Sequence, residues 1–268
     1  MKEMIDIQAL ERDLAAVRSK SPLIHNITNY VVMNNTANGL LAIGASPVMA
    51  HALDEVAEMA AIASAVVINI GTLEPQWVEA MLIAGKTALA KNTPVVFDPV
   101  GAGATSYRNR VCKQIIEECR PSVIRGNASE IMALHDTNVQ TKGVDSTNSS
   151  DAALDAAKAL AKQTGAVVVV SGQTDYITDG KTTKIVFNGS PLMERVTGMG
   201  CTATTVVAAF AAVNSNLLEA AAHGMAIMGI AGEIAAGKSA GNGSLQVNFL
   251  DELCNMDGET IGKYFKHS

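Results

Sequence analysis

Four short runs of apolar residues alternate with longer helix-like segments through much of the chain. The runs are almost wholly apolar rather than alternating, which is typical of strands covered on both faces. The runs are Val66–Ile70, Val95–Asp98, Ser122–Arg125 and Val167–Ser171, and the helical segments before them are Asp54–Ser64, Pro75–Lys91, Arg108–Cys119 and Asp151–Lys162. This alternation predicts an α/β fold with a mostly parallel central sheet and right-handed crossovers.

The rest of the pattern predicts boundaries and domain organisation. Ser150 or Asp151 is the expected N-cap of the last helical segment, and Gly165 lies just past its end. Beyond it, Asp175–Gly180 and Lys184–Phe187 predict a β-hairpin that turns around Asp179 and Gly180. A chain of 268 residues without a Pro/Ser-rich linker or a fixed repeat is expected to form a single domain, residues 1–268.

Charge and composition exclude several classes of partner. The net charge is −6 and no run of Lys or Arg forms a basic patch, so we expect no nucleic-acid partner. Charged residues make up only 17% of the chain, which favours a surface partly buried between subunits. The acidic N-terminal segment lacks the apolar centre of a signal peptide, and polar residues interrupt the long apolar stretches. We therefore expect a cytoplasmic protein with no membrane partner.

The cysteines carry no metal or redox motif. None of Cys112, Cys119, Cys201 and Cys254 forms a C-x-x-C pair, so neither a zinc site nor a dithiol centre is predicted. Three of the five histidines, His25, His51 and His223, likewise lack the spacing of metal ligands, and His223 is interpreted as a packing or pocket residue.

Polar or permissive residues follow each of the four apolar runs. They are Asn69–Gly71, Asp98–Gly103, Arg125–Asn127 and Ser171–Gly172. Ligands of open α/β sheets bind at the carboxyl ends of the strands, so these residues predict a built site along one edge. The alternative is that they only form tight turns, which is common for any single one.

A glycine loop precedes the apolar helix that begins near residue 201. Gly198 and Gly200 leave the first N–H groups of this helix free for an anion, which the helix dipole also attracts. No Gly-Lys-Ser/Thr follows, so the loop is not a Walker A motif. Cys201 falls in the first helical turn, where the thiol pKa is lowered, and this predicts some thiolate at neutral pH. The alternative is a small buried hydrophobic residue.

Two further motifs supply candidate charges. In Arg125–Glu130, the Arg125 side chain can reach a phosphate and Glu130 can hold Mg²⁺ through water. The alternative is a capping box with Asn127 as N-cap and Glu130 as its N3 partner, and both roles can coexist. Asp98 ends a strand before a Gly-rich loop, which suits either metal coordination or a hydrogen bond to an acceptor hydroxyl.

Taken in chain order, these motifs resemble the hydroxyethylthiazole kinase family, a branch of the ribokinase-like superfamily. The resemblance runs from about Ser21 to the C-terminal helices. Its most specific part is the segment His25–Asn38 leading to Gly44–Ala50, and the blocks Asp98–Thr105, Arg125–Glu130 and Thr197–Cys201 follow at similar spacing.

The resemblance implies a ribokinase-like three-layer α/β/α fold and a homotrimer with active sites at the subunit interfaces. The activity it implies is ATP-dependent phosphorylation of the hydroxyl group of 4-methyl-5-(2-hydroxyethyl)thiazole in thiamine salvage, with Mg²⁺ as cofactor. It places Asn26, Met49 and Gly198 at the thiazole, and Arg125, Asn127, Ser171 and Gly200 at ATP. Asp98 and Glu130 are implied around Mg²⁺, while Cys201 falls where related sugar kinases carry an aspartate base, so either Cys201 or Asp98 can be the base.

Three alternatives remain open at this point. Hydroxymethylpyrimidine kinase also carries cysteine in this loop, but its family opens with a glycine-rich segment where this chain has Leu23–Thr28. The ATP-dependent NAD(P)H-hydrate dehydratase has a similar fold and is expected to keep aspartate at the position of Cys201. A nucleotide-binding sensor without turnover is the non-enzyme alternative, and the intact glycine loop with Asp98 and Glu130 argues against it.

Overall fold

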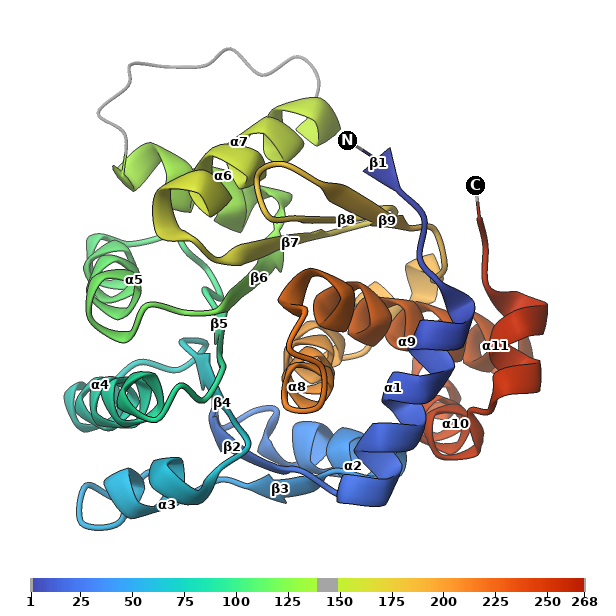
Figure 1. Cartoon of the computed structure of the whole chain (residues 1–268), viewed down its shortest axis with the longest axis horizontal. Coiled ribbons are helices and arrows are strands. Elements are labelled where there is room, and N and C mark those ends of the chain that lie inside the picture. The colour runs from blue at the N-terminus through green and yellow to red at the C-terminus, as the bar shows by residue number, and fades with distance from the viewer. Residues whose placement is uncertain (1, 139–148, 268) are drawn as a thin grey trace.

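The computed structural model describes residues 2–138 and 149–267, and its centre is one mixed β-sheet (Figure 1). Nine described strands lie in the order β1-β9-β8-β7-β6-β5-β4-β2-β3. Neighbours pair in parallel except where β8 runs antiparallel to both β7 and β9. The strands are β1 (Lys2–Glu3), β2 (Leu23–Ile27), β3 (Ser46–Val48), β4 (Ala65–Asn69), β5 (Val95–Asp98), β6 (Val123–Asn127), β7 (Val167–Ser171), β8 (Asp175–Thr178) and β9 (Thr183–Val186).

Helices cover both faces of the sheet, so the fold is an α/β sandwich of three layers (Figure 1). One face packs against α3 (Val56–Ile62), α4 (Pro75–Ala90), α5 (Ser106–Cys119), α6 (Ala128–Asn138) and α7 (Ser149–Thr164). The other packs against α1 (Ile7–Lys20), α2 (Met33–Ile43), α8 (Met199–Ala211), α9 (Leu217–Lys238), α10 (Asn242–Asn255) and α11 (Gly258–Tyr264), with the short 3₁₀ helix η1 (Pro191–Arg195) before α8. The apolar strands therefore have the two-sided cover that their sequences predict.

The predicted parallel strands and the hairpin are confirmed, whereas one helix start is wrong. The four predicted strands are β4 to β7, and β8 with β9 forms the antiparallel hairpin. Helix α7 already includes Ser149 and Ser150, so neither Ser150 nor Asp151 is its N-cap. An aspartate is also favourable inside a first helical turn, because it faces the positive end of the helix dipole. At the other end Gly165 adopts the expected left-handed conformation, with φ +76°.

Helix α9 is long and apolar enough to cross a membrane by length and composition, but it is a core helix. In its most apolar window, 78% of the residues are buried inside the protein. A Cβ atom at Gly229 would lie 2.5 Å from the Asn188 carbonyl oxygen, so this glycine permits close packing of the helix. His223 is also buried in α9, with its Nδ1 atom 2.6 Å from Asp13 Oδ2 of α1. His223 thus packs one core helix against another, as interpreted from the sequence.

Candidate active site

The polar residues after the four apolar runs lie along one edge of the sheet. Strands β4, β5, β6 and β7 are consecutive neighbours, and their register pairs Asn69 with Asp98 and Asn127 with Ser171. The N-terminal turns of α8 contact the same edge through Cys201 and Thr204. Parallel strands end on the same side of a sheet, which is why residues far apart in sequence meet here. The prediction of one polar edge is confirmed.

Asp98 is a buried carboxylate held from two directions. Its Oδ2 atom accepts hydrogen bonds from Asn69 Nδ2 and Thr204 Oγ1, both at 2.8 Å. Burial raises the pKa of Asp98 to about 6, although the neighbouring Arg125 and the two hydrogen bonds act in the opposite direction. Both donors reach Oδ2, so Oδ1 is the carboxylate oxygen left for another partner.

Cys201 lies in the first turn of α8, but the predicted thiolate is wrong. Burial, with a smaller contribution from the charge of Asp98, raises the pKa of the Cys201 thiol to about 12. The Sγ atom accepts hydrogen bonds from Asn69 Nδ2 at 3.2 Å and Asn29 Nδ2 at 3.6 Å, which favour the thiolate less than burial disfavours it. The helix N-terminus therefore does not create a reactive thiolate here.

At pH 7 to 8, Cys201 is expected to resist iodoacetamide because its thiol stays protonated. Cys254 is the exposed cysteine and should be alkylated first, while the buried Cys112 and Cys119 should stay unmodified. Mass spectrometry of peptides after timed alkylation of the folded protein measures all four rates. Alkylation of Cys201 as fast as that of Cys254 would contradict the protonated thiol.

Arg125 links three of the candidate ATP-binding positions. Its Nη2 atom donates to Ser171 Oγ at 2.7 Å, and Ser171 Oγ in turn lies 3.3 Å from the Gly126 carbonyl oxygen. A Cβ atom at Gly200 would lie 2.8 Å from Arg125 Nη1, so the guanidinium packs directly on the backbone of the glycine loop. The buried Nε atom of Arg125 has no partner among the described residues. The Arg125 guanidinium can therefore donate further hydrogen bonds, and it lies beside the N-terminal N–H groups of α8.

Asn127 and Glu130 form the predicted capping box at the start of α6. Asn127 Oδ1 accepts from the Glu130 N–H at 2.9 Å, and Glu130 Oε2 accepts from the Asn127 N–H at 2.8 Å. The other oxygen, Oε1, accepts from the Gly101 N–H at 2.9 Å and so ties α6 to the loop after β5. Both carboxylate oxygens of Glu130 therefore have backbone donors.

The three candidate thiazole residues occupy different environments. Asn26 is buried, donating from Nδ2 to the Ile24 carbonyl at 2.9 Å and accepting at Oδ1 from Thr205 Oγ1 at 2.6 Å. Met49 is half-buried just after β3. Gly198 is the N-cap of α8 with φ +89°, whereas Gly200 lies inside the helix rather than before it. Within residues 2–138 and 149–267, no hydrogen bond joins Asn26 directly to Asp98 or Arg125; Asn26 is connected to the site through Thr205 of α8.

The sequence did not single out several residues that shape this edge. Asn29 donates to Asn69 Oδ1 at 2.9 Å, which turns the amide nitrogen of Asn69 toward Asp98 and Cys201. Arg108 of α5 donates to three carbonyl groups at the ends of β4 and β5, those of Ile70, Gly71 and Val100. Of these residues, only Asn69 gave a sequence signal, because it lies at the end of an apolar run. Asn29 and Arg108 bind residues that are distant in the sequence, and no local pattern marks such contacts.

Asp175 is a second buried carboxylate near Arg125. Its Oδ1 atom accepts from the Gly172 N–H at 3.0 Å, and the side chain is only 7% exposed. Burial raises the Asp175 pKa to about 6, against the opposing Gly172 hydrogen bond and Arg125. It closes the turn that follows Ser171.

Replacing Asp175 by asparagine is expected to stabilise the protein at neutral pH. The pKa of about 6 in the folded protein lies above the ordinary aspartate value of 3.8, so the wild type loses stability as pH rises through this interval. Asparagine keeps an acceptor for Gly172 and carries no charge, so the variant should gain about 2–3 kcal/mol above pH 6. Urea unfolding at pH 4 and pH 7.5 measures the difference in the free energy of unfolding between the variant and the wild type. A difference that does not increase with pH would contradict the burial of the Asp175 charge as its cause.

Comparison with known proteins gives consistent matches over nearly the whole chain. Residues 14–259 match the model of the hydroxyethylthiazole kinase family. A hydroxyethylthiazole kinase from Nitratidesulfovibrio vulgaris is 57% identical, covering 93% of this chain and 94% of the relative. The solved structure of hydroxyethylthiazole kinase from Pyrococcus horikoshii OT3 is 41% identical with a TM-score of 0.90, covering 97% and 98% of the two chains.

A more distant structural neighbour shows the breadth of the fold. A ribokinase-like superfamily protein from Enterococcus faecalis is 13% identical with a TM-score of 0.69, covering 98% of this chain and 96% of its own. The expected ribokinase-like architecture is thereby confirmed.

Proposed function

The chain belongs to the hydroxyethylthiazole kinase family of thiamine salvage, and on that premise we propose how its residues move a phosphoryl group from ATP to a thiazole alcohol. ATP lies across the carboxyl ends of β5, β6 and β7, and the hydroxyethyl oxygen attacks its γ-phosphate in line. The observation that carries this assignment is the meeting of Asp98, Arg125 and Ser171 at one sheet edge under the N-terminus of α8.

The ATP side rests on positive groups held in place by the fold. Arg125 is fixed by Ser171 and by its packing on Gly200, and it contributes a charge to the phosphates. At the start of α8 the Met199 N–H donates to the Val196 carbonyl and the Thr202 N–H donates to the Gly198 carbonyl, while the N–H groups of Gly200 and Cys201 make no backbone hydrogen bond among the described residues. Preorganised donors of this kind stabilise the charge that spreads over a transferring phosphoryl group.

The acidic residues fit a Mg²⁺ ion held chiefly by the nucleotide. The described residues contain no cluster of three or more His, Cys, Asp or Glu side chains able to hold a metal. Mg²⁺ in nucleotide sites needs only one or two carboxylates, because phosphates and water supply the other ligands. Asp98 Oδ1 can contact the ion directly, and Glu130, whose oxygens hold backbone N–H groups, can do so through water. When bound, the ion neutralises phosphate charge.

The acceptor side is formed by Asn26, Met49 and Gly198 around the thiazole ring. Cys201 lines this region as a neutral thiol, held by Asn29 and Asn69. The transition state of phosphoryl transfer is loose, so positioning and charge stabilisation contribute more than early removal of the hydroxyl proton. A protonated cysteine is therefore compatible with turnover.

The decisive test is ADP release from ATP and Mg²⁺ with hydroxyethylthiazole, run beside hydroxymethylpyrimidine. We expect turnover with the thiazole. Turnover with the pyrimidine alone would overturn the assignment of Asn26 and Met49 to the acceptor. No ADP release with either alcohol, in a folded protein that binds ATP, would favour the hydrate dehydratase or the sensor instead.

Cys201→Asp is expected to keep kcat within about tenfold of the wild type. The side-chain amides of Asn29 and Asn69 already donate to the sulfur and can donate equally to a carboxylate. Where a reaction needs a positioned base, that base raises the rate by about 10²–10⁴-fold, so an aspartate here should not reduce turnover. Steady-state ADP release with a thermal melt as the folding control measures the effect. Near-complete loss of turnover in a folded variant would show that a carboxylate cannot serve at this position.

We also propose a homotrimer with its sites at the subunit interfaces. Exposed apolar side chains gather in the elements around the β3 edge of the sheet, at Tyr30, Val31, Leu41, Leu53 and Ile62. Apolar surface of this kind is typical of contacts between subunits. Sedimentation of the purified protein should give three times the chain mass of 27.9 kDa, and a clean monomer would contradict the shared site.

A cytoplasmic location is proposed as well. All four cysteines are free thiols, as a reducing compartment allows, and the long apolar helix α9 belongs to the core.

A further inference from the structure

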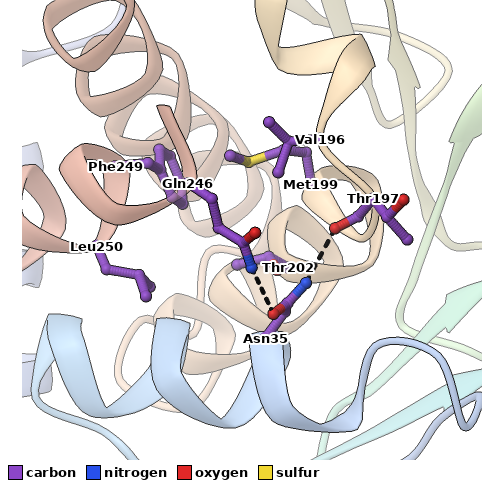
Figure 2. A pocket seen from close by; sticks show the side chains of 8 residues that line it. All are labelled: Asn35, Val196, Thr197, Met199, Thr202, Gln246, Phe249 and Leu250. Atoms are coloured by element: carbon purple, nitrogen blue, oxygen red, sulfur yellow. Dashed lines mark hydrogen bonds between the residues drawn. The ribbon is translucent and has the colours of Figure 1, made fainter. Parts of the chain in front are cut away.

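A small pocket lies behind the glycine loop, between that loop and helices α2 and α10 (Figure 2). Its volume is about 10 Å³, roughly the space of one water molecule, so it is too small for a substrate. Its lining includes Asn35 of α2, Thr197 of the loop and Gln246 of α10. Its significance lies in the hydrogen bonds that cross it.

Two side-chain amides connect α10 to the glycine loop through α2. Gln246 Nε2 donates to Asn35 Oδ1 at 2.7 Å, and Asn35 Nδ2 donates to the Thr197 carbonyl oxygen at 3.0 Å (Figure 2). A backbone carbonyl can only accept, so it fixes the nitrogen of Asn35 toward Thr197. The oxygen of Asn35 must then face Gln246, which leaves Gln246 as the donor. The Thr197 carbonyl group therefore sets the donor-to-acceptor direction of both hydrogen bonds.

This carbonyl belongs to the peptide that enters Gly198. Because the peptide is planar and trans, holding the Thr197 oxygen on α2 also fixes the direction of the Gly198 N–H. Gly198 itself has φ +89°, and a Cβ atom there would lie 3.0 Å from Val32 Cγ1. The loop is thus pressed against α2 at the residue where the chain enters α8.

A second bond ties α10 to the segment before the loop. Asn242 Nδ2, at the start of α10, donates to the Arg195 carbonyl at 3.3 Å. Thr197 is exposed, whereas Val196 and Met199 on either side of the Thr197–Gly198 peptide are buried. The Thr197 carbonyl oxygen is held by the hydrogen bond from Asn35 of α2, which α10 supports through Gln246.

We propose that Asn35 and Gln246 are positioning residues that hold the Thr197–Gly198 peptide so that the first N–H groups of α8 face the transferring phosphoryl group. The inference rests on the proposed function, because it assigns those N–H groups to the phosphate. Donors of this kind act only when they are fixed in place before the reaction, and displacement by about 1 Å costs on the order of 10²-fold in rate. Helix α10 is in this sense part of the catalytic framework.

Asn35→Asp and Gln246→Glu test the proposal with nearly unchanged shape. Asn35→Asp puts an oxygen against the Thr197 carbonyl in place of the donor. Gln246→Glu replaces the donor to Asn35 by an acceptor. The Asn35 amide should then rotate so that its nitrogen donates to the introduced carboxylate and its oxygen faces the Thr197 carbonyl. Both variants should lose at least about tenfold in kcat with a smaller change in KM, because a transition-state interaction is lost.

The matched control is Asn248→Asp, the same chemical change on α10. Asn248 Nδ2 also donates to a backbone carbonyl, that of Lys238 at 3.3 Å, and to Ser239 Oγ at 2.8 Å, away from the loop. This variant should retain the kcat of the wild type. An equal loss of kcat in all three variants would show a general effect of introducing a carboxylate on α2 or α10 and would overturn the proposal.

Amide hydrogen exchange gives a readout that needs no turnover. In protein without ligand, the peptide spanning residues 197–201 should exchange faster in Asn35→Asp and Gln246→Glu than in the wild type or in Asn248→Asp. Exchange and kcat both unchanged in Asn35→Asp would overturn the inference. So would faster exchange throughout the protein, which would indicate a structural role alone. A wild type that phosphorylates no thiazole would count against the proposed function, while exchange would still decide whether the two amides hold the loop.

Discussion

Asp98→Ala is expected to lower kcat by about 10²–10³-fold, the cost of removing one preorganised charge-stabilising group. The substitution removes the carboxylate oxygen left free at the sheet edge. It also leaves the amide of Asn69 and the hydroxyl of Thr204 without their common acceptor. Steady-state ADP release with the thiazole, at saturating ATP and Mg²⁺, measures the loss.

Two further variants separate charge from packing at this position. Asp98→Asn keeps the shape and an acceptor oxygen, so a loss as large as that of Asp98→Ala assigns the effect to the charge. Asp155→Ala removes an aspartate with an 82% exposed side chain and should leave kcat unchanged. If Asp98→Ala retains kcat within tenfold in a folded protein, the carboxylate has no part in the transfer.

Arg125→Ala is expected to reduce kcat/KM for ATP by about 10²–10³-fold. The guanidinium is the positive group that packs on Gly200 and is held by Ser171. Its removal also withdraws the charge that counteracts burial at Asp98 and Asp175, so the pKa of both carboxyl groups should rise further. Isothermal titration with ATP and steady-state kinetics measure binding and turnover separately.

Arg125→Lys and Arg110→Ala serve as the controls. Lysine keeps the charge but not the planar fork, so partial recovery would show that geometry and charge both contribute. Arg110 is an exposed arginine beside the ring of Tyr107, and its replacement should leave ATP binding unchanged. Wild-type kcat/KM in Arg125→Ala would remove this residue from the ATP site.

The parallel core of the fold could be predicted from the sequence because its strands are almost wholly apolar. The same criterion missed β2, whose centre contains the polar residues His25 and Asn26, although both are buried. It also missed β1 and β3, which have two and three residues and lie at the edges of the sheet. Short edge strands carry little periodic signal, since they are defined by their partners rather than by their own pattern.

The polar sheet edge of the candidate site was predictable where polar residues follow an apolar run. Asp98, Arg125 and Ser171 were found on this basis, and the capping role of Asn127 and Glu130 followed from local spacing. The state of Cys201 was not predictable. Its pKa depends on burial and on Asp98, which is 103 positions away in the chain, whereas sequence shows only the helix start.

The two faces of the sheet also differ in when a growing chain can complete them. The buried apolar residues on the side of α3 to α7 all lie between Ile27 and Val170, so that side is complete once these residues have left the ribosome. The opposite side joins residues from Ile5 to Phe265. At about 5–20 residues per second, synthesis of the remaining stretch takes on the order of 5–20 s.

During this interval one face of the strands has only α1 and α2 and lacks α8 to α11. Helix α8 covers the side of the sheet that is completed last. The strands that carry Asp98 and Arg125 are therefore synthesised before the glycine loop. In a chain that folds as it is synthesised, the proposed phosphate site would therefore be completed only after α8 is made, and part of one apolar sheet face would stay uncovered until α8 to α11 follow.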